Sequence, residues 1–316
     1  NSGTITTGGA NADGMLALMG STALNTAAGS IVTSGDEASG MVAWSGSSAE
    51  NAGSIETKGW AAHGMSAEGS ATALNSGTIK TSGLNGHGIF AGNGSSATNT
   101  GLVATSGDVA VGMMATDNSQ VLNQGTVLTS GSASFGMQAH DGSTATTAAA
   151  GRVETWGENA YGMEAILVSS ADNAGTVVTH GEGAAGMVAL TGSWAQSSGS
   201  IVTLGRGAFG MMASGDSDAA NSGSIVTSGE GAHGMYASNS SGLVNSGSIA
   251  TSGEAAHGMA AAHGSIATNE AAGRIDTDRG YGMAAWDSSS VTNNGSIVTT
   301  GLSALGMAAS GSSTAN

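Results

Sequence analysis

The sequence has no cysteine and no proline among its 316 residues, and aromatic side chains are scarce. Without cysteine there can be no disulfide, so the chain is compatible with an oxidising exterior but gains no stability from it. The absence of proline fits a chain whose strands are internal and need every backbone N–H. Five Trp, three Tyr and three Phe are too few for an ordinary globular core.

Basic residues are also few. Six Lys and Arg stand against 22 Asp and Glu, giving a net charge of −16, so we expect neither nucleic acid nor anionic membranes as partners. No apolar run approaches the roughly 20 residues that span a bilayer, and no signal peptide precedes Asn1. We expect no membrane insertion of this segment, and any targeting parts would lie outside it.

What the sequence does contain is one repeat that runs through its whole length. The segment "NSGSIVTSGEGAHGMYASNSSGLV" at 221–244 is followed by "NSGSIATSGEAAHGMAAAHGSIAT" at 245–268, and the same frame continues to both ends. The repeat units, here called coils, have about 24 residues and number 13. They begin at residues 1, 25, 51, 75, 99, 123, 147, 173, 197, 221, 245, 269 and 293.

Certain positions of the coil hardly vary. With insertions set aside, position 3 is always Gly, position 5 Ile or Val, position 7 Thr, position 14 Gly and position 17 Ala; position 15 is Met in 12 of the 13 coils. These positions fall two apart in three groups, separated by Gly-rich turns, as in strands that bury one face. The pattern predicts an all-β fold, a three-sided parallel β-solenoid.

The composition of one coil indicates that no coil folds alone. An Ile or Val and a Met contribute about 3 to 6 kcal/mol of burial, well below the roughly 1 to 2 kcal/mol per residue needed to order 24 residues. Stability must come from neighbouring coils, with stacked Asn side chains hydrogen-bonding at a corner. We expect one array over 1–316, a window of a longer chain or a filament subunit, with end-to-end self-association through its bare edges.

The tandem segments "NSGTITT", "NSGSIVTSGEGAHGM" and "NSGSIATSGEAAHGM" resemble the passenger regions of autotransporters, the type V secreted surface proteins of Gram-negative bacteria. The resemblance covers the whole chain and is to a style of repeat. It implies a right-handed β-helix at the cell surface, anchored to the outer membrane or released, with a role in adhesion, biofilm or filament formation. No catalytic residue is carried over with it.

Four histidines share position 13, in two pairs from adjacent coils. Adjacent coils would hold the two side chains of a pair about 5 Å apart, a spacing that suits a bridging metal. The other coils place Asp, Ser, Val, Phe, Tyr, Ala or Leu at this position, which is why we interpret it as an outward corner. We therefore predict no metal ligand and no cofactor at His63, His87, His233 and His257.

Acidic side chains recur at position 10. Stacked carboxylates could bind Ca²⁺, but the glycine-rich nonapeptide of calcium-binding β-rolls is absent. A solvated acidic ridge that keeps the protein soluble is the interpretation we adopt. The ridge comprises Asp36, Asp108, Glu158, Glu182, Glu230 and Glu254.

The coil from 269 is the best candidate for an enzyme site, because charged and aromatic side chains gather there. Arg274 and Asp276 lie two apart on one strand and can form an exposed pair, as can Arg152 and Glu154 in an earlier coil with the same "AAG" insertion. No long loop builds a substrate cleft. The other members of the cluster are Glu270, Asp278, Arg279, Tyr281, Trp286 and Asp287.

The tryptophans are scattered. Side chains of this kind can stack on sugars, but Trp44, Trp60, Trp156, Trp194 and Trp286 form no continuous stripe in the sequence. Position 6 lacks the Thr array of an ice-binding face.

We predict an extracellular structural and adhesive β-solenoid that is not an enzyme, with no catalytic residue. Its partners would be a host-cell or matrix surface, or glycans. The alternative is a carbohydrate-active β-helix enzyme or a phage tailspike-like protein, and paired carboxylates beside a long groove-lining loop would favour it.

Overall fold

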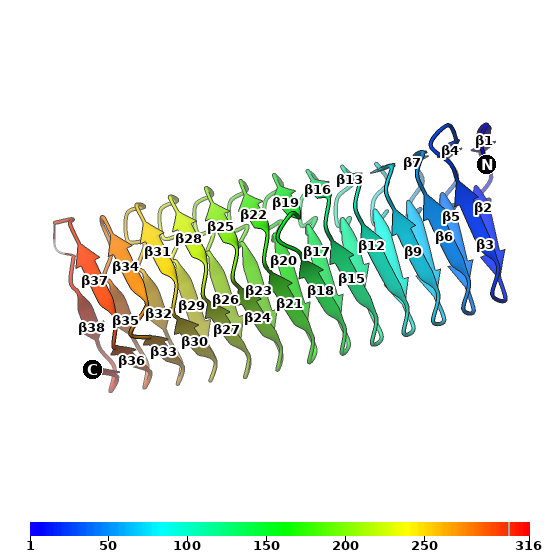
Figure 1. Cartoon of the computed structure of the whole chain (residues 1–316). Helices are drawn as coiled ribbons and strands as arrows, with labels where there is room; N and C mark the ends of the chain where they lie inside the picture. The colour runs from blue at the N-terminus through cyan, green and yellow to red at the C-terminus, as the bar shows by residue number, and fades with distance from the viewer. Residues whose placement is uncertain (303) are drawn as a thin grey trace. The chain divides into compact units, whose positions relative to one another are not determined.

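The computed structural model describes residues 1–302 and 304–316, which form two compact units, 1–160 and 161–316. Each unit is built from short parallel strands, and the described residues contain no helix (Figure 1). Every coil contributes three strands, one to each of three sheets. The prediction of an all-β, three-sided parallel solenoid of 13 coils is confirmed.

In the first unit each strand pairs in parallel with its equivalent in the next coil, and identical positions are partners, as in Ile31↔Ile55 and Met41↔Met65. The first sheet contains β1 (Thr4–Thr7), β4 (Ser30–Thr33), β7 (Ser54–Thr57), β10 (Thr78–Thr81), β13 (Leu102–Thr105), β16 (Thr126–Thr129) and β19 (Arg152–Thr155). The second contains β2 (Met15–Leu18), β5 (Met41–Trp44), β8 (Met65–Glu68), β11 (Ile89–Gly92), β14 (Met113–Ala115) and β17 (Met137–His140). The third contains β3 (Thr22–Asn25), β6 (Ser48–Asn51), β9 (Thr72–Asn75), β12 (Ser96–Asn99), β15 (Gln120–Asn123) and β18 (Thr144–Thr147).

The second unit repeats the arrangement. Its first sheet contains β22 (Thr176–Thr179), β25 (Ser200–Thr203), β28 (Ser224–Thr227), β31 (Ser248–Thr251), β34 (Arg274–Thr277) and β37 (Ser296–Thr299). Its second contains β20 (Met163–Ile166), β23 (Met187–Leu190), β26 (Met211–Ser214), β29 (Met235–Ser238), β32 (Met259–Ala261), β35 (Met283–Ala285) and β38 (Met307–Ala309). Its third contains β21 (Ser170–Asn173), β24 (Trp194–Ser197), β27 (Asp218–Asn221), β30 (Gly242–Asn245), β33 (Ile266–Asn269), β36 (Ser290–Asn293) and β39 (Thr314–Ala315).

The invariant positions of the repeat point inward. The Ile or Val of position 5 and the Met of position 15 are fully buried in most coils, as at Ile201 and Met187. Because position 14 lies against the next coil, a Cβ on Gly234 would overlap Ile249 and come within 2.6 Å of the Gly258 carbonyl oxygen. Only glycine allows coils to approach this closely at that point.

Buried polar side chains form ladders along the stack. The Nδ2 of Asn25 donates to the Oδ1 of Asn51 at 2.8 Å, and Asn51 donates to Asn75 in the same way. The ladder is confirmed as predicted, and it satisfies amides that burial would otherwise leave unpaired. A second ladder joins position 21, where the Ser95 amide donates to the Ser119 hydroxyl at 3.1 Å.

Candidate functional site

The four position-13 histidines lie in stacked columns. The ring centroids of His63 and His87 are 4.9 Å apart with nearly parallel planes, and those of His233 and His257 are 4.7 Å apart. His87 is buried and the other three are half-buried. Our interpretation of position 13 as an outward corner is therefore wrong: the rings are packed against their neighbours from adjacent coils.

The rings have a hydrogen-bonding role that accounts for their burial. The backbone N–H of His87 donates to the Nδ1 of His63 at 3.1 Å, and that of His257 donates to the Nδ1 of His233 at 3.0 Å. An accepting Nδ1 leaves the ring hydrogen on Nε2. Asp13 has the same role: its carboxylate accepts a hydrogen bond from the backbone N–H of Ser39 at 2.8 Å.

Burial makes these histidines poor bases. Desolvation lowers the pKa of His63 and His257 to about 4. It lowers the pKa of His87 and His233 to about 3, with a further lowering by the neighbouring histidine of each pair. The rings are therefore neutral at physiological pH. Among the described residues no group of three or more His, Cys, Asp or Glu side chains is arranged to hold a metal ion.

In the second unit the histidines belong to a longer aromatic column. Phe209 stacks on His233 at 5.3 Å and His257 stacks on Tyr281 at 4.8 Å. The ring of Trp286 is tilted relative to that of His257, and the two ring centroids are 5.5 Å apart. We expected Tyr281 and Trp286 to belong to the cluster of charged and aromatic side chains in the coil from 269, whereas both lie in this column.

The acidic residues of position 10 divide by environment. Asp36 and Asp108 each accept a backbone N–H from the following coil, of Trp60 at 2.9 Å and of Ser132 at 2.8 Å. Glu230 lies 3.5 Å from the Nε of Arg206, and Glu254 is exposed. Asp36 and Asp108 therefore have a structural role in holding adjacent coils together.

The charged residues of the coil from 269 do not converge on one point. Arg274 and Asp276 form the predicted exposed pair, joined by two hydrogen bonds of 2.6 and 2.8 Å. Arg279 lies 3.5 Å from Asp278, and Asp287 lies 3.6 Å from His263. The carboxylates are thus occupied in separate surface pairs.

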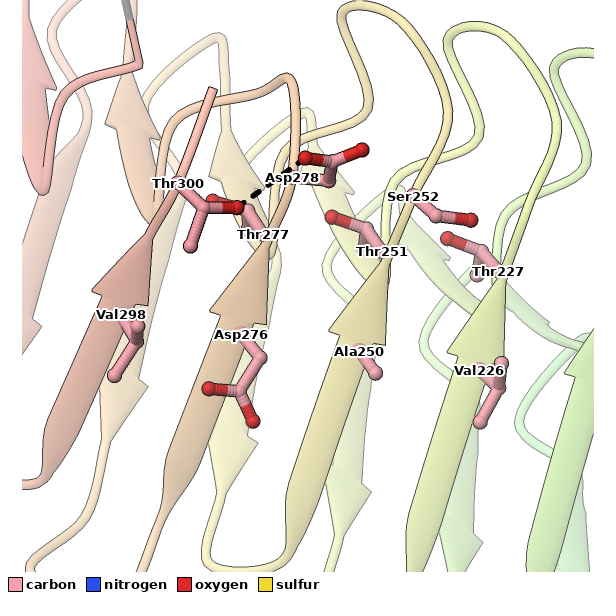
Figure 2. Close-up of a pocket in the computed structure, with 10 residues that line it drawn as sticks. All are labelled: Val226, Thr227, Ala250, Thr251, Ser252, Asp276, Thr277, Asp278, Val298 and Thr300. Atoms are coloured by element: carbon pink, nitrogen blue, oxygen red, sulfur yellow. Dashed lines mark hydrogen bonds between the residues drawn. The ribbon is translucent and has the colours of Figure 1, made fainter.

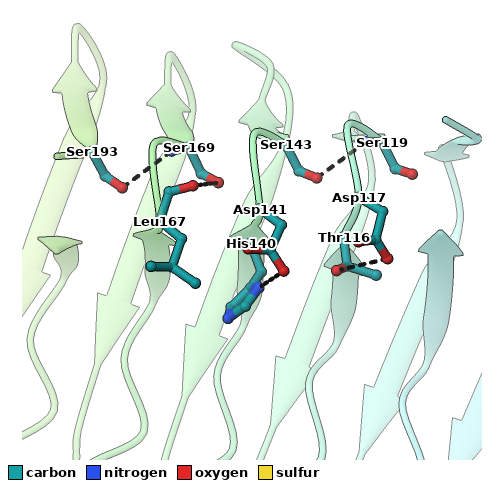
Figure 3. A network of polar contacts seen from close by, with 9 residues as sticks. All are labelled: Thr116, Asp117, Ser119, His140, Asp141, Ser143, Leu167, Ser169 and Ser193. Carbon is teal, nitrogen blue, oxygen red and sulfur yellow. Dashed lines mark hydrogen bonds and ion pairs between the residues drawn. The ribbon is translucent and has the colours of Figure 1, made fainter. Parts of the chain in front are cut away.

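Outward side chains at the turn after the second sheet form short polar contacts that differ from coil to coil (Figure 3). His140 and Asp141 are 2.7 Å apart, and Thr116 donates to Asp117 at 3.3 Å. Next to them the serine ladder is regular, as where the Ser169 amide donates to the Ser193 hydroxyl at 3.1 Å. The contrast separates an invariant inner frame from a variable surface.

A groove runs across the strands of the first sheet in the first unit, with a volume of about 380 Å³. The backbone of the position-7 threonines lies between two rows of outward side chains, those of positions 6 and 8. This groove could not be predicted from the sequence, because a groove depends on how far the side chains of neighbouring coils project from the sheet. Its lining comprises Glu56, Thr57, Lys80, Thr81, Ser82, Ala104, Thr105, Ser106, Leu128, Thr129, Ser130 and Trp156.

The second unit has a groove of about 240 Å³ at the same positions of the repeat (Figure 2). Val226, Ala250, Asp276 and Val298 project from its strands. Asp278 lies at the strand ends and accepts a hydrogen bond from the Thr300 hydroxyl at 3.2 Å. This groove contains two carboxylates and no aromatic side chain.

These features define a parallel β-solenoid in which an invariant frame carries a variable surface. The chain belongs to the family of the BigA third pectate lyase-like domain, whose model matches residues 1–151 and again residues 136–316. No curated protein matches the sequence.

Among solved structures, the fold is similar to a chain of the Vag8–C1 inhibitor complex determined by cryo-EM. The two share 17% sequence identity over 99% of this chain and 92% of that chain, with a TM-score of 0.71. Together with the family match, this shared β-helical fold confirms the predicted resemblance to the passenger regions of autotransporters. No helix in the described residues could cross a membrane.

Proposed function

We propose that this chain is the extracellular structural and adhesive part of a bacterial surface protein. The observation that carries the proposal is the division between an inner frame repeated in every coil and outward side chains that change from coil to coil. Such a division lets a solenoid present many different contacts on one stable support. The fold shared with Vag8, whose solved complex contains C1 inhibitor, supports a role in binding.

The proposal includes no catalytic step. Asp276 and Asp278 both line the groove of the second unit, but Asp276 is bound by Arg274 and Asp278 lies 3.5 Å from the Nε of Arg279, so each carboxylate already has a basic partner. This pairing favours a surface role over acid–base chemistry at that groove. Incubation with polysaccharides should release no new reducing ends and no unsaturated products. Release of either, abolished by Asp276→Asn or Asp278→Asn, would instead establish the carbohydrate-active enzyme.

Attachment of cells tests the adhesive role. Residues 1–316 displayed on a non-adherent bacterium should increase attachment to epithelial cells or to matrix-coated plates, and the purified chain added in solution should compete. Cells displaying an unrelated domain at equal density are the control. Equal attachment of both strains on every surface would contradict the proposal. Self-association into fibres stays a prediction.

A further inference from the structure

We propose that the groove of the first unit binds a linear, neutral, β-linked glycan. This inference rests on the proposed adhesive function and names the surface and the ligand class. The groove crosses five consecutive coils, from Glu56 to Trp156. At about 4.8 Å per coil it extends over roughly 19 Å.

The spacing of the side chains selects the class of polymer. Neighbouring position-6 residues are register partners, as in Lys80↔Ala104 and Ala104↔Leu128, so the groove offers one equivalent set of contacts per coil, every 4.7 to 4.9 Å or so. A pyranose in an extended β-linked chain advances by nearly this length. An extended peptide advances only about 3.3 Å per residue, so its residues would not match the spacing of the coils.

The chemistry of the lining matches a sugar. A pyranose has an apolar face and a rim of hydroxyl groups. Trp156 closes one end of the groove with its indole 44% exposed, which provides a surface for the apolar face. The exposed hydroxyls of Ser82, Ser106 and Ser130 form a row along one side. Ser82 and Ser106 donate to the carbonyl oxygens of Thr57 and Thr81 at 3.5 and 3.4 Å, which leaves their oxygen lone pairs to accept hydrogen bonds from sugar hydroxyls.

The half of the groove that ends at Trp156 has no charged residue in its lining. Ala104 and Leu128 are the position-6 residues of this half, and the charged Glu56 and Lys80 line the two coils at the other end. Glu56 is paired with Lys58 at 3.0 Å. On a protein of net charge −16, such a surface favours an uncharged polymer over a polyanion.

The second unit provides an internal comparison. Its groove has the same place in the repeat, but its charged side chains are the two carboxylates Asp276 and Asp278, whereas the first groove has one carboxylate, Glu56, and one ammonium group, Lys80. The groove is thus a property of the fold. The indole and the uncharged stretch from Ala104 to Trp156 are specific to the first unit.

Titration calorimetry of the purified chain tests the inference. The probes are cellohexaose, xylohexaose and chitohexaose, with α-linked maltohexaose as a control for repeat length and β-1,4-linked hexamannuronate as a control for charge. We expect at least one neutral β-linked hexasaccharide to bind and both controls to bind at least about tenfold more weakly. Trp156→Ala should weaken binding about tenfold.

Two further variants locate the site. Ala104→Gln fills the middle of the groove with an uncharged side chain at a position where other coils hold Glu, Lys or Leu, and it should also weaken binding about tenfold. Trp194→Ala removes an indole of similar exposure from the third sheet and should leave binding unchanged. Circular dichroism checks that each variant is folded. If Trp156→Ala does not fold, the binding measured with Ala104→Gln decides the test.

Several results would overturn the inference: binding of none of the neutral β-linked probes, equal binding of a control probe, or wild-type affinity in a folded Ala104→Gln protein. If cells that display the chain still attach while the groove binds no glycan, the groove is excluded as the binding site and the adhesive function is retained. If displayed cells do not attach, the adhesive function fails whether or not glycan binds.

Discussion

A single backbone amide explains why such different residues occupy position 13. The amide of this position needs an acceptor, and in several coils the side chain of the preceding coil supplies it, through the Asp13 carboxylate or the Nδ1 of His63 or His233. The residue at position 13 can therefore vary, as long as adjacent coils remain connected by hydrogen bonds or packing. The histidine that resembles a ligand in the sequence is a structural acceptor.

The buried histidines predict a loss of stability in weak acid. In the unfolded chain each ring titrates near its ordinary pKa of 6.5, whereas the folded pKa of His233 is about 3 and that of His257 about 4. Only the unfolded state takes up protons as pH falls from 6.5 toward 4. The free energy of unfolding should therefore be constant above pH 6.5 or so and decrease by about 1.4 kcal/mol per histidine for each pH unit below it.

Urea unfolding between pH 4 and 8 measures this dependence. The double variant His233→Asn, His257→Asn is the matched control, because an amide oxygen can accept the same backbone N–H and does not titrate. Its stability should depend less on pH than that of the wild type. Identical pH dependence in both proteins would show that the rings are not the cause.

Val168 predicts a stabilising substitution. It is β-branched, 75% exposed, and has a φ of 60°, in the left-handed region that disfavours such residues. The equivalent residue of the next coil is Gly192, with a φ of 72°. Val168→Gly should relieve the strain and raise the free energy of unfolding by up to about 1 kcal/mol.

Thermal melting of Val168→Gly and of Gly192→Val measures the effect in both directions. The second variant introduces the strain at the matched site, so its melting temperature should fall. A lower melting temperature for Val168→Gly, or a higher one for Gly192→Val, would contradict the account of this turn.

At the scale of elements, the strands were predictable where one face is buried. Ile or Val and Thr lie two apart at positions 5 and 7, and Met and Ala lie two apart at positions 15 and 17. Such an alternation is caused by the burial of one face of a strand. The surfaces were not predictable in the same way. The burial of His87 depends on Phe90, whose ring stacks over it with centroids 6.3 Å apart, and the sequence does not reveal how an outward ring folds over its neighbour.

The asparagine ladder predicts a graded response in the third sheet. Asn75 is fully buried, accepts from Asn51 and donates to Asn99, both at 2.8 Å. Asn75→Ala removes one hydrogen bond from each of these partners in a buried setting and should cost about 1 to 3 kcal/mol. Asn75→Ser should cost less, because Ser197 already accepts from Asn173 at 3.1 Å in this ladder.

Chemical denaturation of the two Asn75 variants measures the difference. Ser76→Ala, next to the ladder but exposed, serves as the control and should change stability by less than about 0.5 kcal/mol. Equal stability of Asn75→Ala and wild type would mean that the ladder does not hold the coils together.

For the whole molecule, the fold followed from the 24-residue period and the function did not. Periodicity identifies what every coil shares, which is the inner frame. Binding depends on the residues that differ between coils, such as the uncharged stretch between Ala104 and Trp156. The repeat does not predict which of these differing residues lie next to one another on the surface. The tryptophans appeared scattered because the sequence does not show that one of them closes a groove.

The central claim is that the coils depend on their neighbours, and hydrogen exchange in Met187→Asp tests it most directly. Met187 is fully buried, and its strand β23 pairs with β20 on one side and β26 on the other. A carboxylate there should remove amide protection from these three strands while β32 and β35 keep theirs. Loss confined to β23, or equal loss through the whole second unit, would contradict the account.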